Sequence, residues 1–393
     1  MVFQLVRPYT PMLALLSLAI IFLGRFWWPG EASAWAGSAR FALLSFLIAY
    51  LLSGEIGKGF KAKALLVTAG LLVSWVIVNF LLVGGDSGVL RRSIVLMVFV
   101  CAVVVLKDAR TDWLRQLLMV VVVVAAVAAF VTLIYQLRAR GLDFKYRAFR
   151  LSNSGVTGFA QFGNPIISGL YMAFAGLTAL WCVLRTNKVW AKSLWFFCLL
   201  VIGLYVFLTF SRTAWVAMGL GGAVLFVFQA KRDYFLLAIG VTFALFVSLV
   251  LWRFPEILSV ELERGATGRH LIWNMVLSSM SGYWWLGHGA GSSMQPMSIP
   301  GQQVVNTHSL YLEVLFQYGI VGLALFISSL LLALRQLWLE RSEMAVLGLC
   351  LLVGCIGVMF FDLYSFIHSP NLVWLWVWFP LGLALACSKD GVR

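Results

Sequence analysis

Residues 117–134 read LLMVVVVVAAVAAFVTLI, an uncharged run in which only Thr132 is polar. A helix rises about 1.5 Å per residue, so a run of this length nearly spans a hydrocarbon core of about 30 Å. Comparable runs recur along the 393-residue chain, which is 62% hydrophobic and only 11% charged. Soluble domains carry about 25% charged residues. The pattern lacks the alternation of a membrane β-barrel, so we predict an all-α integral membrane protein.

We expect about twelve transmembrane helices in a single polytopic domain covering residues 1–393. The first is interpreted as an uncleaved span, because it is too long for the apolar part of a signal peptide. The expected spans lie near 12–28, 36–53, 64–83, 92–107, 114–136, 164–184, 191–210, 213–230, 234–252, 308–334, 344–361 and 371–387. Between the ninth and tenth spans, residues 253–307 form the largest predicted outer loop.

The lysines indicate the orientation of these spans. An even number of spans places both termini on the same side of the membrane. With both termini cytoplasmic, every lysine except Lys145 falls in an inner loop, which agrees with the positive-inside rule. Most arginines instead fall on the outer side, which insertion bias does not explain. Contact with lipid headgroups is the alternative explanation for Arg25, Arg40, Arg91 and Arg92. A planar guanidinium also suits bidentate binding of phosphate, so the outer surface is a candidate site for an anionic substrate.

Two long outer connections concentrate these arginines. The first, residues 137–163, contains Arg147 and Arg150, which share a face if that stretch is helical. The second, residues 253–307, contains Arg264 and Arg269. Apolar residues at helical spacing after position 268 predict a short helix lying on the outer surface, with Thr267 as its N-cap.

Three further outer features point to chemistry on this side. Arg212 interrupts an apolar stretch at the tight turn between the seventh and eighth spans. The glycines of the turn at 285–292 would let backbone N–H groups approach an anion. His308 lies where the last long loop runs into a helix, close to the membrane, and is a candidate general base.

Neither a DxD pair nor metal-ligand spacing occurs, so we expect neither a metal nor another cofactor. The run Trp374-x-Trp376-x-Trp378 is interpreted as a lipid-facing aromatic stretch.

Taken in order, several short motifs resemble those of the O-antigen ligase and polymerase superfamily. The resemblance covers roughly residues 147–322, and the chain's length is more similar to the ligases (WaaL-type) than to the longer protein-glycosylating relatives. The matching elements are Phe162-Gly163-Asn164-Pro165, Ser211-Arg212-Thr213, Gly268-Arg269-x-x-x-Trp273, Leu286-Gly287-His288-Gly289, and His308-Ser309 followed after nine residues by Gly319-x-x-Gly322.

The resemblance implies a GT-C-like membrane fold and an inverting, metal-independent glycosyl transfer. The implied donor is an O-antigen glycan on undecaprenyl pyrophosphate, and the implied acceptor is lipid A-core. The reaction would occur on the periplasmic face of the bacterial inner membrane, in lipopolysaccharide biosynthesis. Carried onto this chain, His308 is the expected catalytic base, and Arg212 and Arg269 are the expected pyrophosphate contacts.

The outer positive charge adds Arg147 and Arg150 to the expected pyrophosphate site. Further residues are expected to line the substrates. These are Arg264, His270, Trp273, His288, Ser309 and Tyr311. His368 is placed on the last outer turn together with Asp362, where a solvated turn is the favoured interpretation. The expected partners are the two lipid-linked glycans and membrane lipids, with no nucleic acid.

Two other functions remain open. An O-antigen polymerase would use the same lipid-linked donor but add its glycan to another lipid-linked glycan. A transporter of a lipid-linked glycan is a different class of protein. Transporters commonly show internal repeats and ionisable groups at mid-membrane. The charges here cluster at one face and no clear repeat is visible, which favours a transferase.

Overall fold

The computed structural model describes residues 6–27, 32–141, 150–229, 268–294, 296–299, 302–304 and 306–388, with isolated positions at 248, 252, 255 and 259–260. Within these ranges, nine helices are long and apolar enough to cross a membrane. They are α2 (Thr10–Trp27, preceded by the 3-10 turn η1, Arg7–Tyr9), α3 (Ala32–Leu52), α4 (Lys63–Val83), α5 (Gly88–Ala109), α6 (Thr111–Arg140), α7 (Pro165–Arg185), α8 (Val189–Leu208), α13 (Leu310–Glu340) and α14 (Glu343–Phe361).

Shorter apolar helices account for two more expected spans. They are α9 (Arg212–Gln229) and the pair formed by the π-helical turn η2 (Trp374–Trp378) and α15 (Phe379–Leu385). The remaining expected span, 234–252, lies almost wholly outside the described residues. The prediction of an all-α integral membrane protein is therefore confirmed.

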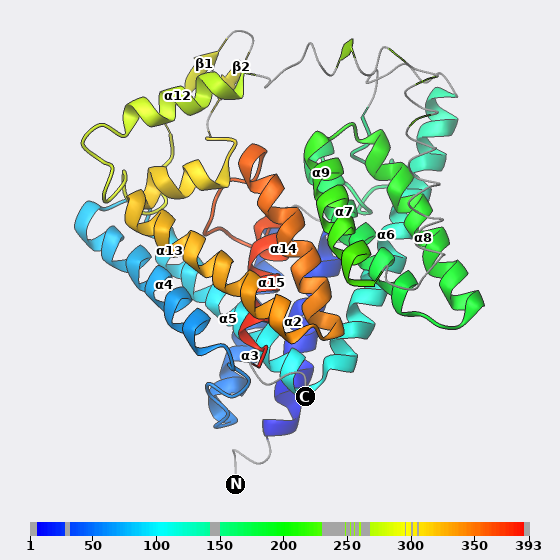
Figure 1. Cartoon of the computed structure of the whole chain (residues 1–393), viewed down its shortest axis with the longest axis horizontal. Coiled ribbons are helices and arrows are strands. Elements are labelled where there is room, and N and C mark those ends of the chain that lie inside the picture. Colours follow the sequence, from blue (N-terminus) through cyan, green and yellow to red (C-terminus); the bar gives the residue numbers. More distant parts are fainter. Residues whose placement is uncertain are drawn as a thin grey trace.

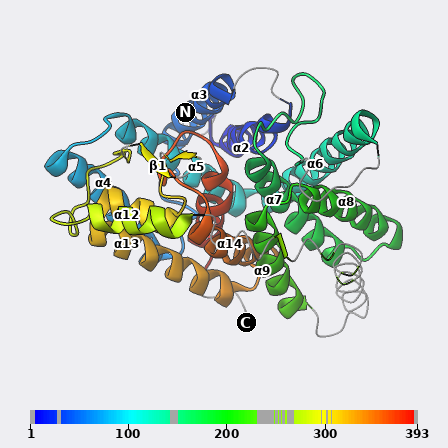
Figure 2. The same cartoon turned by 90° about the horizontal axis from the view of Figure 1, so that it is seen from above.

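The helices form a bundle with two flanks (Figures 1 and 2). On one flank α13 packs against α4, and on the other α7 packs against α8 and α9. In the middle, α14 contacts both α9 and α13, while α15 contacts α5 and α14. The central position of α14 means that its C-terminal end lies between the two flanks.

The tryptophan run 374–378 is buried, so its interpretation as a lipid-facing stretch was wrong. Trp374, Trp376 and Trp378 are each at most 3% exposed. Their rings contact Phe99, Phe174 and Phe366 respectively. Aromatic side chains bury more apolar area than any others. Here that area fills the space between the central helices rather than facing lipid.

At one end of the bundle, basic side chains are paired with acids. Lys107 Nζ lies 2.9 Å from Glu340 Oε1, and Arg115 Nη2 lies 2.7 Å from Glu343 Oε2. The backbone N–H of Lys61 donates to the carbonyl of Leu385. The start of α2 and the end of α15 lie at this same end (Figure 1). The loops with the expected chemistry gather at the opposite end.

The outer loop expected at 253–307 contains the predicted short helix, α12 (Arg269–Ser279), which lies across the top of the bundle in Figure 1. Its buried residues Ile272 and Val276 pack against Leu315 and Phe316 of α13. The N-cap is Gly268, in a left-handed conformation with φ 74°, and not Thr267, which lies outside the described residues. The same loop holds a two-stranded antiparallel ribbon, β1 (Met297–Ile299) and β2 (Gln302–Val304), that the sequence did not predict.

Helix α13 differs from the expected span in two ways. It begins at Leu310, so His308 precedes the helix instead of lying within its first turn. It is also broken at Gly319, which has φ 67° and ψ −171°. The glycine turn at 285–292 fits into this kink, because the N–H groups of His288 and Gly289 donate to the carbonyls of Phe316 and Gln317.

Candidate functional site

Asp362, directly after α14, is the meeting point of the candidate site. Its carboxylate is buried and accepts a hydrogen bond of 2.6 Å from the Thr213 hydroxyl of α9. Oδ2 also lies 3.6 Å from Nη2 of Arg269, the first residue of α12. Oδ1 lies 3.9 Å from Nδ1 of His308. Residues from three other stretches of the chain therefore surround the Asp362 carboxylate.

The loop before α13 fixes the position of His308. The His308 backbone has φ 48°, an uncommon conformation for a side chain of this size. Its N–H donates to Asn306 Oδ1 at 3.2 Å. The hydroxyl of the next residue, Ser309, donates to the carbonyl of Met359 in α14. The imidazole is 27% exposed. His308 is therefore held with Nδ1 toward Asp362 and with part of its imidazole exposed.

A buried polar network supports this loop from below. The Thr307 hydroxyl lies 2.7 Å from the Ser309 carbonyl oxygen and 3.1 Å from Glu313 Oε2. Gln317 donates to Glu313 Oε1 at 2.6 Å and to the carbonyl of Ser292 at 3.2 Å. Buried polar groups with all their partners restrict the backbone to one arrangement. The network thus couples the His308 loop to α13 and to the glycine turn.

Arg269 is held by packing as well as by charge. Its guanidinium lies 6.0 Å from the centre of the Phe361 ring, and its side chain is 19% exposed. One turn later, Trp273 stacks on the same Phe361 at 6.4 Å. Arg269 and Trp273 therefore share one face of α12, as their spacing indicated. That face points toward the end of α14.

The backbone of Arg212 adjoins the candidate site because the next residue in the chain is Thr213. It is the first residue of α9 and is half-buried, between the buried residues Ser211 and Thr213. Thr213 touches Asp362, so the Arg212 backbone lies next to the carboxylate that Arg269 and His308 face. The structure thus brings His308 and Arg269 together at Asp362, and it places the backbone of Arg212 beside them through Thr213.

Arg150 lies at the turn that leads into α9. Its Nε donates to the Thr209 carbonyl at 2.8 Å, and its Nη2 donates to the Phe210 carbonyl at 3.4 Å. These contacts brace the backbone two residues before Arg212. Arg150 thereby has a structural role that its sequence context did not indicate, and a pyrophosphate contact for it stays a prediction. Arg147 and Arg264 lie outside the described residues.

The other expected lining residues differ in their surroundings. His270 is exposed beside Arg269. The His288 ring is sandwiched between Tyr283 at 4.2 Å and Phe316 at 4.3 Å, and its Nε2 lies 3.1 Å from the Ser279 carbonyl. Tyr311 packs against Phe360 at 4.7 Å. His288 therefore fastens α12 to α13, and its ring faces are covered by other aromatic rings.

The glycine turn at 285–292 does not offer its central N–H groups to an anion. The N–H groups of Gly287, His288, Gly289 and Ala290 donate to the carbonyls of Tyr283, Phe316, Gln317 and Gly84 respectively. The expectation of an anion-binding turn fails there because the glycines allow close contact with the α13 kink and with the 84–85 connection. The glycines instead mark a place where this turn packs closely against other segments of the same chain.

Thr213 and Asp362 are the residues of the candidate site whose contact the sequence did not reveal. Asp362 was visible as one of few outer acids, but its closest partner is 149 positions away in the chain. Among the described residues, no group of three or more His, Cys, Asp or Glu side chains is arranged to hold a metal ion.

The region that carries this geometry also matches known proteins. A family model described as O-antigen ligase matches residues 196–327, which include Arg212, Arg269 and His308. A protein of Pseudomonas aeruginosa named O-antigen ligase is 31% identical over 238 residues, which cover 59% of this chain and 56% of that protein. The matched region thus spans about half the length of this relative. The two matches support an O-antigen ligase family member, in agreement with the resemblance of the motifs.

Proposed function

We propose that this protein is a membrane glycosyltransferase that transfers an O-antigen glycan from undecaprenyl pyrophosphate to lipid A-core. The observation that carries the proposal is the cluster of His308, Arg269 and Thr213 around Asp362, with Arg212 next to Thr213 in the chain. It combines a histidine that can act as a base with an arginine cation at the loop end of the helix bundle. The ligase family match makes lipopolysaccharide biosynthesis the fitting process. The site would face the periplasm, and both termini of this inner-membrane protein would be cytoplasmic.

His308 suits the role of general base. An acceptor hydroxyl would attack the anomeric carbon while His308 Nε2 takes its proton. Asp362 faces Nδ1, the other ring nitrogen, and its negative charge favours the imidazolium that forms. The 3.9 Å separation is longer than a hydrogen bond, and contacts of this kind commonly tighten when substrate binds. Proton removal of this type contributes about 10²–10⁴-fold to a rate.

The two arginines suit the leaving group. As the bond between the anomeric carbon and the pyrophosphate oxygen breaks, the pyrophosphate gains negative charge. Arg212 and Arg269 can donate two N–H bonds each to such oxygens, which is the strong geometry for phosphate. Attack from the face opposite the leaving group would invert the anomeric carbon. No metal would be needed, because guanidinium groups would supply the charge stabilisation.

Binding of the pyrophosphate donor would change the contacts of Arg269. In this structure its guanidinium is shared with Asp362 at 3.6 Å, outside ideal hydrogen-bond distance. A pyrophosphate carries more charge than one carboxylate and would draw the guanidinium toward itself. Asp362 would keep its 2.6 Å hydrogen bond from Thr213 and stay directed at His308. Donor binding would thus move Arg269 toward the phosphate and leave Asp362 facing the imidazole of His308.

The proposal is tested with purified protein, a lipid-linked glycan and lipid A-core. The wild-type chain should attach the glycan to lipid A-core. His308→Ala should lower the rate by about 10²–10⁴-fold, whereas Ser278→Ala, at an exposed position of α12, should stay close to wild type. Extension of the lipid-linked glycan with no transfer to lipid A-core would identify a polymerase instead. Full transfer by a folded His308→Ala protein would rule out His308 as the base, and neither transfer nor extension by the wild-type chain would favour transport.

A further inference from the structure

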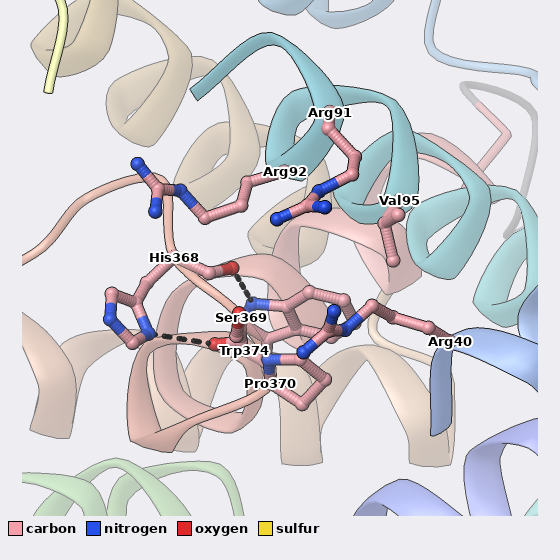
Figure 3. A pocket seen from close by; sticks show the side chains of 8 residues that line it. All are labelled: Arg40, Arg91, Arg92, Val95, His368, Ser369, Pro370 and Trp374. Atoms are coloured by element: carbon pink, nitrogen blue, oxygen red, sulfur yellow. Dashed lines mark hydrogen bonds between the residues drawn. The ribbon is translucent and has the colours of Figure 1, made fainter. Parts of the chain in front are cut away.

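A second cluster of arginines lies away from the His308 site. A pocket is lined by Arg40 of α3, by Arg91 and Arg92 in the first turn of α5, and by the loop residues His368 and Ser369. Figure 3 shows the Arg40 and Arg91 guanidiniums directed at the space above the 368–370 loop. None of these residues belongs to the cluster around Asp362. The pocket nevertheless adjoins that cluster in the chain, because Asp362 and His368 occupy the same loop between α14 and η2.

Two of the three arginines are available to a ligand. Arg92 forms an ion pair with Asp86, which also accepts a hydrogen bond of 2.8 Å from the N–H of Gly88. Arg40 uses its Nε to donate to the Ala36 carbonyl at 3.1 Å, which leaves its two terminal nitrogens for other partners. Within the described residues, neither Arg40 nor Arg91 makes an ion pair with a carboxylate. The pocket therefore carries an excess of positive charge.

The floor of the pocket is rigid. Trp374 is buried, and its indole N–H donates to the His368 carbonyl at 3.1 Å (Figure 3). The His368 ring lies 3.2 Å from the Ser369 carbonyl through Nδ1. Pro370, which is also buried, has a fixed φ and restricts the backbone of Ser369 before it. The loop is thus a preformed surface against which a bound group would be held.

The two helices that carry the arginines also expose apolar side chains. Phe41 and Leu44 on α3 are 74% and 53% exposed, and Ile94 on α5, three positions after Arg91, is 62% exposed. Exposed apolar side chains on membrane helices face lipid chains. Arginine heads on the same helices as such side chains match a lipid, whose phosphate sits at the boundary and whose tails lie in the membrane.

We propose that the pocket of Arg40, Arg91, Arg92 and His368 binds the phosphate group of a membrane lipid. Bidentate guanidinium contacts would hold the phosphate oxygens, while the tails lie along α3 and α5. The lipid is either an ordinary anionic phospholipid or a phosphorylated glycolipid of the lipid A type. Binding here leaves the arginines of the Asp362 cluster unoccupied, so the site is separate from the one proposed for the pyrophosphate.

The test uses native mass spectrometry of the full-length protein in detergent. Phosphatidic acid is compared with diacylglycerol, which lacks only the phosphate, and lipid A is compared with phosphatase-treated lipid A. The variant is Arg40→Gln with Arg91→Gln, and Arg92 is left intact because its pair with Asp86 supports the structure. Arg138→Gln, an exposed arginine of α6, is the matched control for charge. Arg91→Lys, at an exposed position, serves as a second variant should the double change impair folding.

The wild type and Arg138→Gln should retain the phosphorylated lipids better than their phosphate-free counterparts. The double variant should bind them at least about tenfold more weakly, and Arg91→Lys should show part of that loss. A loss for both lipids would assign the site to any lipid phosphate, and a loss confined to lipid A would assign it to a glycolipid. Equal retention by wild type and folded variants, or no preference for the phosphate, would overturn the proposal. Because transfer is not measured, neither result decides the proposed reaction.

Discussion

Asp362 Oδ1 lies 3.9 Å from His308 Nδ1, although the two residues belong to different helix ends of the bundle. Thr213 fixes the carboxylate from the other side with a hydrogen bond of 2.6 Å. The acid is buried, so its negative charge is directed at the imidazole and at Arg269 rather than dispersed in solvent. We therefore expect Asp362 to position His308 without itself exchanging a proton with the substrate.

Asp362→Asn keeps the shape of this side chain and removes its charge. The Thr213 hydroxyl can still donate to the amide oxygen, so the fold should persist. The rate of glycan transfer should fall by about 10²-fold or more, because the imidazolium loses its counter-charge. The KM for the acceptor should change much less than kcat. Asp112→Asn, at an exposed acid of α6, is the control, and a purely structural role for Asp362 would instead lower the melting temperature and leave kcat of the folded fraction intact.

Arg269→Lys tests whether a fork of donors is required for the pyrophosphate. Lysine keeps the charge but offers a single point of contact, so transfer should fall by about 10²–10³-fold with a raised donor KM. Arg138→Lys should leave both constants unchanged. Transfer kinetics at varied donor concentration give the answer. Wild-type kinetics for Arg269→Lys would show that charge alone suffices there.

Gly319→Ala tests the kink of α13. Gly319 has φ 67°, and an added Cβ would lie 2.2 Å from the Trp285 carbonyl oxygen. Neither the backbone nor the glycine turn can move without losing the hydrogen bond from Ile320 N–H to the Trp284 carbonyl. The substitution should therefore destabilise the protein by more than about 1 kcal/mol and lower its melting temperature. Gly203→Ala, in the middle of α8 with open space around it, should be neutral or stabilising.

His368 gives the protein a pH-dependent contribution to stability. The protein packed around the ring lowers its pKa; the nearby Arg92 adds to this, while the contact with Ser369 opposes it. Since the folded pKa lies below the unfolded value, the folded state favours neutral His368. Its contribution is present above about pH 6.5 and is lost as the pH falls through the folded pKa. The melting temperature should decline from pH 7 to pH 5 less steeply in His368→Gln than in the wild type, and identical slopes would contradict this.

The membrane helices could be predicted from the sequence because a hydrocarbon core requires long uncharged helical runs. The outer helix 269–279 also followed from apolar spacing, with an error of one residue at its cap. Trp374 and its neighbours show the limit of that reasoning. A tryptophan at the membrane and a tryptophan in the centre of a bundle look alike in sequence, and only the contacts with Phe99, Phe174 and Phe366 separate them.

The site was partly predictable for a similar reason. His308, Arg212 and Arg269 stood out as ionisable groups where charges are costly. Asp362 did not, because one acid after an apolar span looks like an ordinary helix end. Its significance depends on Thr213 and Arg269, which approach it only in the folded bundle. The prediction of an anion-binding turn at 285–292 was wrong because glycines permit close backbone contact with protein and with anions equally.

The most direct test of the account is a structure of the full chain with bound undecaprenyl pyrophosphate. We predict that the diphosphate oxygens lie within hydrogen-bond distance of the Arg212 and Arg269 guanidiniums, with the terminal phosphate facing the His308 imidazole. A diphosphate bound instead at Arg40 and Arg91, with His308 remote from it, would contradict the proposed site and mechanism.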